Sequence, residues 1–184
     1  MKPGIPIDIL HEIEFAIQAM DPDSLNIFVD EVEKARQIFC LGAGRAGILL
    51  KAFCMRLNHL GYNAYLAGGI PCPPVGSGDL IVAASGSGTT PSVTAVLKRG
   101  KVAGARIVAF TARESKAPIP GADLVIFVPA PANLVNERNT KSQQPMRTLF
   151  EQVVFLICES AICILKAKKG IGDEEMAQRH ANLE

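Results

Sequence analysis

Five short apolar segments are spaced along the chain, and few polar residues interrupt them. They are Ile38–Leu41, Asn63–Ala67, Leu80–Ala84, Arg106–Thr111 and Leu124–Val128. Their apolar residues follow one another instead of alternating with polar ones. This pattern predicts strands that are buried on both faces, as in a parallel sheet.

Helical periodicity separates several of these segments. Apolar residues recur at three- and four-residue intervals in Ala46–Leu60 and in Pro91–Val102, and each of these stretches follows a predicted strand. Strands that alternate with helices imply parallel strands joined by right-handed crossovers. We therefore expect a single α/β domain over residues 1–184, a three-layer α/β/α sandwich with a five-stranded parallel sheet.

Four more helices are expected outside this alternating region. Two precede the first strand, and the second of them has Asp21 as a good N-cap with proline in its first turn. Two follow the last strand after a polar loop at Pro129–Gln144, and apolar residues cover more than one face of the longer one. This excess apolar surface predicts a homo-oligomer. The four ranges are Ile5–Met20, Asp21–Arg36, Pro145–Lys168 and Asp173–Asn182.

The composition is that of an ordinary globular protein, with 48% hydrophobic and 20% charged residues and a formal net charge of +1. Without a basic surplus, and with no Trp and two Tyr, nucleic acid is not an expected partner. Acidic residues near the N-terminus do not fit a signal peptide, and the uncharged runs do not read as membrane helices. We expect a cytoplasmic protein without a membrane partner, whose five cysteines, lacking CxxC spacing, are buried and reduced.

A glycine-rich turn follows the first predicted strand. Gly42-Ala43-Gly44-Arg45-Ala46-Gly47 fits the G-x-G-x-x-G pattern of a dinucleotide-binding turn at the start of a helix. The dinucleotide interpretation also needs an acidic residue about 20 residues later to hold the ribose. The chain has no acidic residue between Glu33 and Asp79. The turn therefore predicts an anion site at a helix N-terminus and disfavours a nicotinamide cofactor.

A second loop with hydroxyl groups follows the third predicted strand. Ser85-Gly86-Ser87-Gly88-Thr89-Thr90 directly precedes the helix that begins at Pro91. Glycine lets the backbone approach a phosphate, and the hydroxyl groups can donate to phosphate oxygens. Both loops are expected at the carboxyl edge of the sheet, where ligands bind in open α/β folds. Together they predict a site for a sugar phosphate.

These motifs resemble a known family. The two loops resemble those of the sugar isomerase (SIS) domain, which has a flavodoxin-like α/β/α fold. The segments "SQQPMRTLFEQ" at Ser142–Gln152 and "MAQRHANLE" at Met176–Glu184 narrow the resemblance to the 6-phospho-3-hexuloisomerases. The resemblance implies interconversion of D-arabino-hex-3-ulose 6-phosphate and fructose 6-phosphate, a step of the ribulose monophosphate pathway of formaldehyde fixation. It also implies a homotetramer that needs no metal or redox cofactor.

The sequence departs from the family pattern at two positions. The family usually reads G-A-G-R-S-G, and this chain has Ala46 in place of that serine. The family often reads S-G-S-G-E-T, and this chain has Thr89 in place of the glutamate. We expect the first change to remove a potential phosphate donor and the second to alter the rim of the loop.

The resemblance also suggests residue roles. Moving a carbonyl from C3 to C2 through a cis-enediol requires a base that takes a proton from C2 and returns one to C3. Glu151 is the candidate base, and His180, acting in its own or a neighbouring subunit's site, is the candidate shuttle for oxygen-bound protons. Arg45 would neutralise the phosphate or the enediolate.

The remaining site residues are assigned to substrate binding. The hydroxyl groups of Ser85, Ser87 and Thr90, with the backbone N–H groups of the turn at residues 86–88, are expected to hold the phosphate. The full set of binding candidates is Gly42, Gly44, Arg45, Ser85, Gly86, Ser87, Thr89 and Thr90.

Two alternatives remain open. The same sheet edge could serve a non-catalytic sugar-phosphate sensor, or an isomerase of another phosphosugar. Glu151 and His180 favour catalysis, since a sensor needs no base, whereas the departures at Ala46 and Thr89 leave the choice of sugar open.

Overall fold

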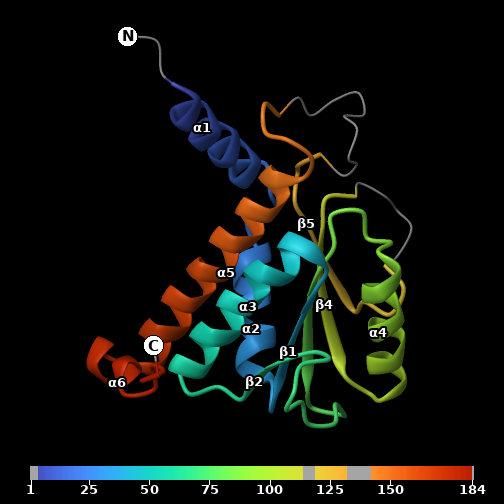
Figure 1. Cartoon of the computed structure of the whole chain (residues 1–184), viewed down its shortest axis with the longest axis vertical. Coiled ribbons are helices and arrows are strands. Elements are labelled where there is room, and N and C mark those ends of the chain that lie inside the picture. Colours follow the sequence, from blue (N-terminus) through green and yellow to red (C-terminus); the bar gives the residue numbers. More distant parts are fainter. Residues whose placement is uncertain (1–3, 114–118, 132–141, 184) are drawn as a thin grey trace.

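A parallel five-stranded sheet forms the centre of the molecule. The computed structural model describes residues 4–113, 119–131 and 142–183. The strands lie in the order β2-β1-β3-β4-β5, and all four neighbouring pairs are parallel (Figure 1). This is the flavodoxin-like order, so the predicted fold class is confirmed. The strand bounds are β1 Ile38–Gly42, β2 Ala64–Leu66, β3 Leu80–Ala84, β4 Arg106–Thr111 and β5 Leu124–Phe127.

Helices cover both faces of this sheet. On one face lies a layer of α2, α3 and α5, with α1 packed against α5, and on the other face lies α4. Figure 1 shows these three layers, with α4 alone on its side of the sheet. The helix bounds are α1 Ile5–Gln18, α2 Ser24–Lys34, α3 Gly44–His59, α4 Pro91–Val102, α5 Thr148–Lys169 and α6 Asp173–Ala177.

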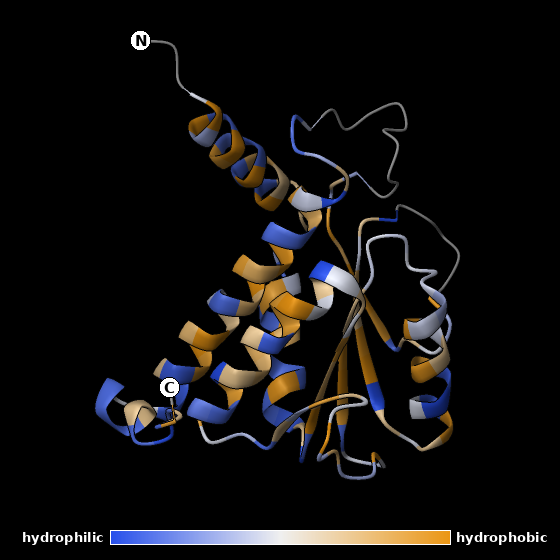
Figure 2. Ribbon diagram, in the orientation of Figure 1, coloured by the Kyte–Doolittle hydropathy of each residue, from blue (hydrophilic) through white to orange (hydrophobic). Residues whose placement is uncertain are grey.

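Consecutive strand residues point to opposite layers, which explains the continuous apolar runs. On β1, Ile38 and Cys40 belong to the cluster under α3 and α5, whereas Phe39 and Leu41 belong to the cluster under α4. Figure 2 shows apolar strands between helices that mix apolar and polar residues. Where both faces are covered, as along β1, β3 and most of β4, the strands need apolar residues at every position. At the edge of the sheet, β5 exposes Val125 and Phe127, so the prediction that all five strands are buried on both faces is wrong for β5.

The predicted start of α2 is wrong by two residues, since the N-cap is Asp23 and not Asp21. The helix begins at Ser24, and the Asp21 carboxylate accepts a hydrogen bond from the Asp23 backbone N–H at 3.0 Å. This local turn competes with a helical start at Pro22, because a short acidic side chain can satisfy backbone groups outside a helix. Of the predicted polar loop at Pro129–Gln144, residues 132–141 lie outside the described residues.

Most apolar residues of α5 are buried within the chain itself. Phe150, Val154, Ile157, Ile162 and Leu165 are all buried, because α5 packs against α1, α2 and α3. Leu156 on the same helix is 39% exposed and Phe155 is only partly buried, so part of the apolar surface of α5 stays open, and the homo-oligomer expected from this helix stays a prediction. Among the described residues, α5 is also the one helix long and apolar enough to cross a membrane, a test that a core helix also passes.

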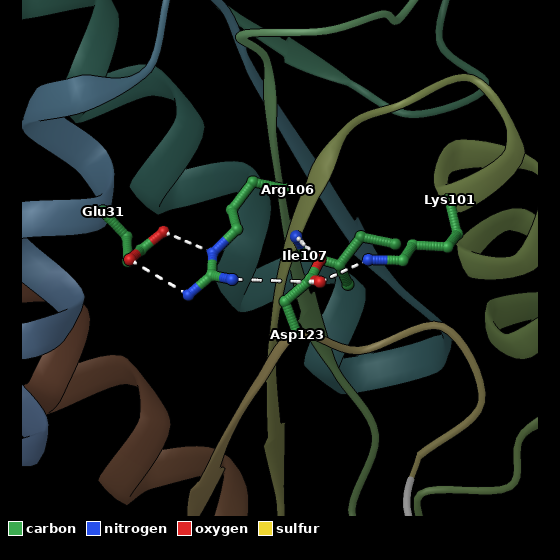
Figure 3. Close-up of polar contacts among 5 residues, drawn as sticks. All are labelled: Glu31, Lys101, Arg106, Ile107 and Asp123. Carbon is green, nitrogen blue, oxygen red and sulfur yellow. Dashed lines mark hydrogen bonds and ion pairs between the residues drawn. The ribbon is translucent and has the colours of Figure 1, made fainter.

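A polar network holds the other edge of the sheet, where β4 begins. Arg106 donates to both carboxylate oxygens of Glu31 on α2, and Asp123 receives hydrogen bonds from Lys101 and from the Ile107 backbone N–H (Figure 3). The hydrogen bond to Glu31 raises the pKa of Arg106. Partial burial opposes ionisation of Asp123, but the bonds from Lys101 and Ile107 lower its pKa. This network ties α2, α4, β4 and the start of β5 together, and it lies away from the loops that carry the candidate site.

Three of the five cysteines meet the expectation of buried thiols. Cys40, Cys54 and Cys158 are buried, whereas Cys72 and Cys163 are exposed. Burial raises the pKa of the Cys158 thiol, which keeps it protonated and unreactive. The expectation fails for Cys163 because that residue lies on the solvent side of α5.

Candidate functional site

The two predicted loops begin side by side at the carboxyl edge of the sheet. Gly42, the last residue of β1, is the register partner of Ala84, the last residue of β3. The chain leaves β1 toward β2 on one side and returns to β3 on the other, which makes this the topological switch point of the sheet. Ligands bind at such a point because two loops diverge there and leave room between them.

The first and last glycines of the G-x-G-x-x-G turn serve packing. A Cβ on Gly42 would lie 2.7 Å from the Gly47 backbone nitrogen, and a Cβ on Gly47 would lie 2.5 Å from the Gly42 carbonyl oxygen. Gly44 differs, because its φ of 57° favours glycine and nothing lies within 4 Å of a Cβ there. Of the two predicted binding glycines, Gly44 therefore faces open space, and Gly42 lets α3 start tightly against β1.

The second loop is well packed. The hydroxyl groups of Ser85 and Thr90 lie 2.8 Å apart and share a hydrogen bond, and the Gly88 N–H donates to the Ser85 carbonyl at 2.9 Å. Thr111 Oγ1 donates to the Gly86 carbonyl at 3.2 Å. Ser85, Gly86 and Gly88 are buried, so the loop has a fixed shape and is not a flexible surface segment.

Two backbone donors of this loop remain available for a ligand. Within the part of the chain that the structure describes, the N–H groups of Gly86 and Ser87 have no acceptor. Ser87 is half-buried and Thr89 is exposed, so both lie nearer solvent than Ser85. Free N–H groups at the start of α4 favour an anion there.

The first turn of α5 brings Glu151 to the glycine-rich turn. Arg45 Nε donates to Glu151 Oε2 at 2.5 Å, although the two residues are far apart in the sequence. The Glu151 side chain is 13% exposed, and that of Arg45 is 66% exposed. The contact fixes one carboxylate oxygen, and Glu151 Oε1 bonds to none of the residues that the structure describes, so it can accept a proton. The structure thus brings together two of the predicted site residues, a carboxylate and a guanidinium.

A second arginine at the site was missed in the sequence. Arg147, the residue directly before α5, lies over the Ser/Gly loop, since a Cβ on Gly86 would meet Arg147 Cδ at 2.9 Å. Its Nε is buried and has no hydrogen-bond partner among the described residues. The sequence held a sign of this role, because Arg147 directly precedes the long helix. A cation is unfavourable at the positive end of a helix, and a bound anion would compensate for it.

Helix α1 holds the segment that leads into this turn of α5. Glu12 accepts hydrogen bonds from Ser142 Oγ at 2.5 Å, the Gln143 N–H at 2.7 Å and Gln144 Nε2 at 3.1 Å. Partial burial of Glu12 opposes its ionisation, but the three hydrogen bonds outweigh that effect and lower its pKa. The negative carboxylate therefore fixes the chain a few residues before Arg147.

The structure does not bring His180 to Glu151 within one chain. The His180 ring packs against the ring of His59, the last residue of α3, with 5.2 Å between centroids. Arg45 lies in the first turn of the same helix, so the two ends are about 20 Å apart along its axis. Figure 1 accordingly shows α6 at the far end of α5 from its first turn. In this single chain, His180 therefore lies far from Glu151, and its role in its own or a neighbouring subunit's site stays a prediction.

The two departures from the family pattern fall in different surroundings. The Ala46 side chain is buried in the core cluster under α3 and α5, so it faces away from a ligand. The expected loss of a phosphate donor at this position stays a prediction. Thr89 is exposed at the rim of the loop, as expected.

The assembled site combines anion-binding groups with one carboxylate. Within residues 4–113, 119–131 and 142–183, no three His, Cys, Asp or Glu side chains are grouped as metal ligands would be. Backbone N–H groups, two arginines and hydroxyl groups can hold an anionic group, and Glu151 beside them can accept a proton. This chemistry suits proton transfer on a phosphorylated substrate.

Comparisons with known proteins agree on the family. The SIS domain family matches residues 31–156. A 3-hexulose-6-phosphate isomerase of Bacillus subtilis is 36% identical over 177 residues, which span 96% of this chain and 96% of the relative. A protein of the same name from Mycobacterium gastri is 37% identical and covers 94% of this chain and 86% of its own length.

A solved structure is also similar over nearly the whole chain. It is a protein from Methanococcus jannaschii whose crystal structure is described as inferring a function of 3-hexulose-6-phosphate isomerase. Its TM-score is 0.79 at 29% sequence identity, and the match covers 97% of this chain and 96% of that one.

Proposed function

This chain belongs to the SIS domain family, and we propose that it interconverts D-arabino-hex-3-ulose 6-phosphate and fructose 6-phosphate. One observation carries the proposal: the start of α5 sets the Glu151 carboxylate beside Arg45, and its neighbours Arg147 and Phe150 lie against Gly86 of the Ser/Gly loop. A sensor of sugar phosphates needs the loop but no base. Relatives named 3-hexulose-6-phosphate isomerase support this choice of substrate.

The proposed reaction divides between the loops and Glu151. The N–H groups of Gly86 and Ser87, with the Ser87 hydroxyl group, hold the phosphate and thereby fix the sugar. Glu151 Oε1 takes the proton from C2 of the 3-ulose, the electrons of that C–H bond form the C2–C3 double bond, and the C3 oxygen takes up a proton to give a cis-enediol. The same carboxyl group returns the proton to C3, since both carbons present the same face to it. When C3 is protonated, the C2 hydroxyl group gives up its proton, which leaves the carbonyl at C2.

Arg45 would act on the charge that develops during this transfer. Its guanidinium lies next to Glu151, where negative charge on the enediolate oxygens arises. A fixed cation there stabilises the transition state more than the neutral ground state. We also assign the reaction to the cytoplasm and to the ribulose monophosphate pathway of formaldehyde fixation, as the family resemblance implies.

The direct test is an assay with purified protein. Fructose 6-phosphate is supplied, and the 3-ulose is detected through an aldolase that releases formaldehyde from it. We expect turnover without added metal or nicotinamide, and no loss in EDTA. Binding of fructose 6-phosphate without turnover would favour the sensor, and turnover of another phosphosugar alone would favour a different isomerase.

The phosphate assignment predicts that Ser87→Ala weakens substrate binding by about 1–2 kcal/mol, the scale of one hydrogen bond to a charged group. Ser87 is the best position for this test because its half-buried side chain is accessible to a ligand, whereas the Ser85 hydroxyl group is already bonded to Thr90 within the loop. The measurement is KM for fructose 6-phosphate, with Ser77→Ala, in an exposed turn before β3, as the control. An unchanged KM in the alanine variants of Ser85, Ser87 and Thr90 would refute the assignment.

We further propose a homotetramer, with apolar surface on α1 as part of its contacts. Figure 1 shows the start of α1 extending beyond the other helices. Phe15 is 72% exposed, and Ile5 and Leu10 are also exposed on this helix. Ile48 and Met55 expose further apolar surface on α3. Such surface is unusual for a monomer and typical of a protein interface. A neighbouring chain could then supply His180 to the Glu151 site.

Light scattering at micromolar concentration should accordingly give four times the 19.6 kDa chain mass. Phe15→Glu combined with Leu10→Glu should reduce that mass, because the new charges would be buried at the contact. Lys98→Glu on the exposed side of α4 is a matched control for an added acid. A monomer mass for the unmodified protein would end this proposal.

A further inference from the structure

We propose that Arg147 is the side chain that binds the substrate phosphate, and that Arg45 instead stays with the base Glu151. This inference rests on the proposed function, since it names a further binding residue of the same site. The sequence alone gave Arg45 two possible roles, neutralising the phosphate or the enediolate. This inference assigns the first role to Arg147 and the second to Arg45.

The position of Arg147 is fixed by contact with the Ser/Gly loop. A Cβ added to Gly86 would lie 2.9 Å from Arg147 Cδ, 3.6 Å from its Nε and 3.4 Å from Phe150 Cδ1. The stem of the arginine and the Phe150 ring therefore both lie on the bare backbone of Gly86. Glycine is needed there because any side chain would push the arginine away from the loop.

The donors of Arg147 lack a partner in the described structure. Its Nε is buried from solvent and bonds to no described residue, and no carboxylate among those residues pairs with its guanidinium. A buried donor without an acceptor is unfavourable and needs an explanation. A phosphate on the Gly86 and Ser87 N–H groups would lie next to this donor and accept from it.

The electrostatics of α5 point to the same occupant. Arg147 is the N-cap of that helix, where the helix dipole already places positive charge. The first turn of α5 contains one acid, Glu151, and that carboxylate is bonded to Arg45. A guanidinium without a partner at the positive end of a helix becomes favourable when an anion binds between the guanidinium and the helix N-terminus. Arg45 differs, because its charge already has a partner.

The two arginines therefore predict separable kinetic effects. A phosphate ligand contributes equally to the ground state and the transition state, so its loss raises KM. Arg147→Met should raise KM for fructose 6-phosphate about 10- to 100-fold, the worth of a charge-assisted hydrogen bond, with kcat nearly unchanged. Arg147→Lys should recover part of the loss, since lysine keeps the charge but not the planar donors.

The experiment combines these kinetics with calorimetric titration of inorganic phosphate. Unmodified protein should bind phosphate, and Arg147→Met should lose that binding. Arg99→Met is the matched control, because Arg99 is exposed in the last turn of α4 and its loss changes the net charge equally. Should Arg147→Met fail to fold, Arg147→Gln gives the same readout, because glutamine removes the charge but keeps a polar side chain at this partly buried position.

Each result decides between the assignments. Unchanged phosphate affinity and KM in Arg147→Met, or a fall in kcat alone, would overturn the role of Arg147. Phosphate binding that depends on Arg147 in a protein without isomerase activity would overturn the proposed function and leave this inference standing. Isomerase activity with the same KM in Arg147→Met as in the unmodified protein would overturn this inference and leave the proposed function standing.

Discussion

Replacing Glu151 by glutamine should lower kcat by a factor of at least about 10²–10⁴, the usual contribution of general acid–base catalysis. Glutamine keeps the shape of the side chain and can still accept a hydrogen bond from Arg45 Nε, which Glu151 Oε2 accepts at 2.5 Å. It cannot accept a proton from carbon. KM should change little, because the phosphate is held by the Ser/Gly loop.

Isotope exchange separates loss of the base from other causes of a low rate. The proton on C3 of fructose 6-phosphate is the one that the reverse reaction removes, and it should be replaced by deuterium in deuterated water. Unmodified protein should catalyse this exchange, and Glu151→Gln should abolish it. Glu159→Gln, about two turns further along α5, is the matched control and should exchange normally.

A Gln variant that exchanges at the rate of the unmodified protein would mean that Glu151 is not the base, even with the fold and substrate unchanged. His180→Ala should cost less and retain some exchange, because water can partly replace a group that handles oxygen-bound protons. His180 lies at the far end of α3 from Glu151. Any loss of activity in His180→Ala therefore depends on a neighbouring chain that brings its His180 to the site.

Replacing Phe28 by alanine should lower the free energy of unfolding by about 3–5 kcal/mol, the range for a fully buried phenylalanine. Phe28 on α2 has no exposed surface, and its ring lies 5.7 Å from that of Phe53 on α3 and 5.1 Å from that of Phe110 on β4. The change would leave a cavity between two helices and the sheet. A loss of this size is a large share of the total stability of a typical domain.

The measurement is urea unfolding at a fixed protein concentration, since assembly would shift the apparent stability. The midpoint should fall while the slope with urea stays the same. Val102→Ala is the control, because Val102 is 91% exposed and its truncation should stay within about 0.5 kcal/mol. A midpoint for Phe28→Ala equal to that of the control would show that the three rings do not form a tightly packed centre.

The sequence alone determined most of the fold and the edge that carries the site. Strands covered on both faces need uninterrupted apolar runs, so β3 and β4 were predicted with their observed bounds. Parallel strands put both loops at one edge, so Gly44 and Ser87 were assigned to the same site before their positions were known. The candidate base Glu151 came from the resemblance of its segment to a family.

Only the tertiary structure decided which side chains meet. Apolar periodicity shows which residues of α5 share a face, but it does not show what each face packs against. In the structure, most of these residues pack against α1, α2 and α3. The contacts of Arg147 with Gly86 and of His180 with His59 join residues distant in the sequence. They depend on where each helix end lies after packing, and neither spacing nor residue type encodes that position.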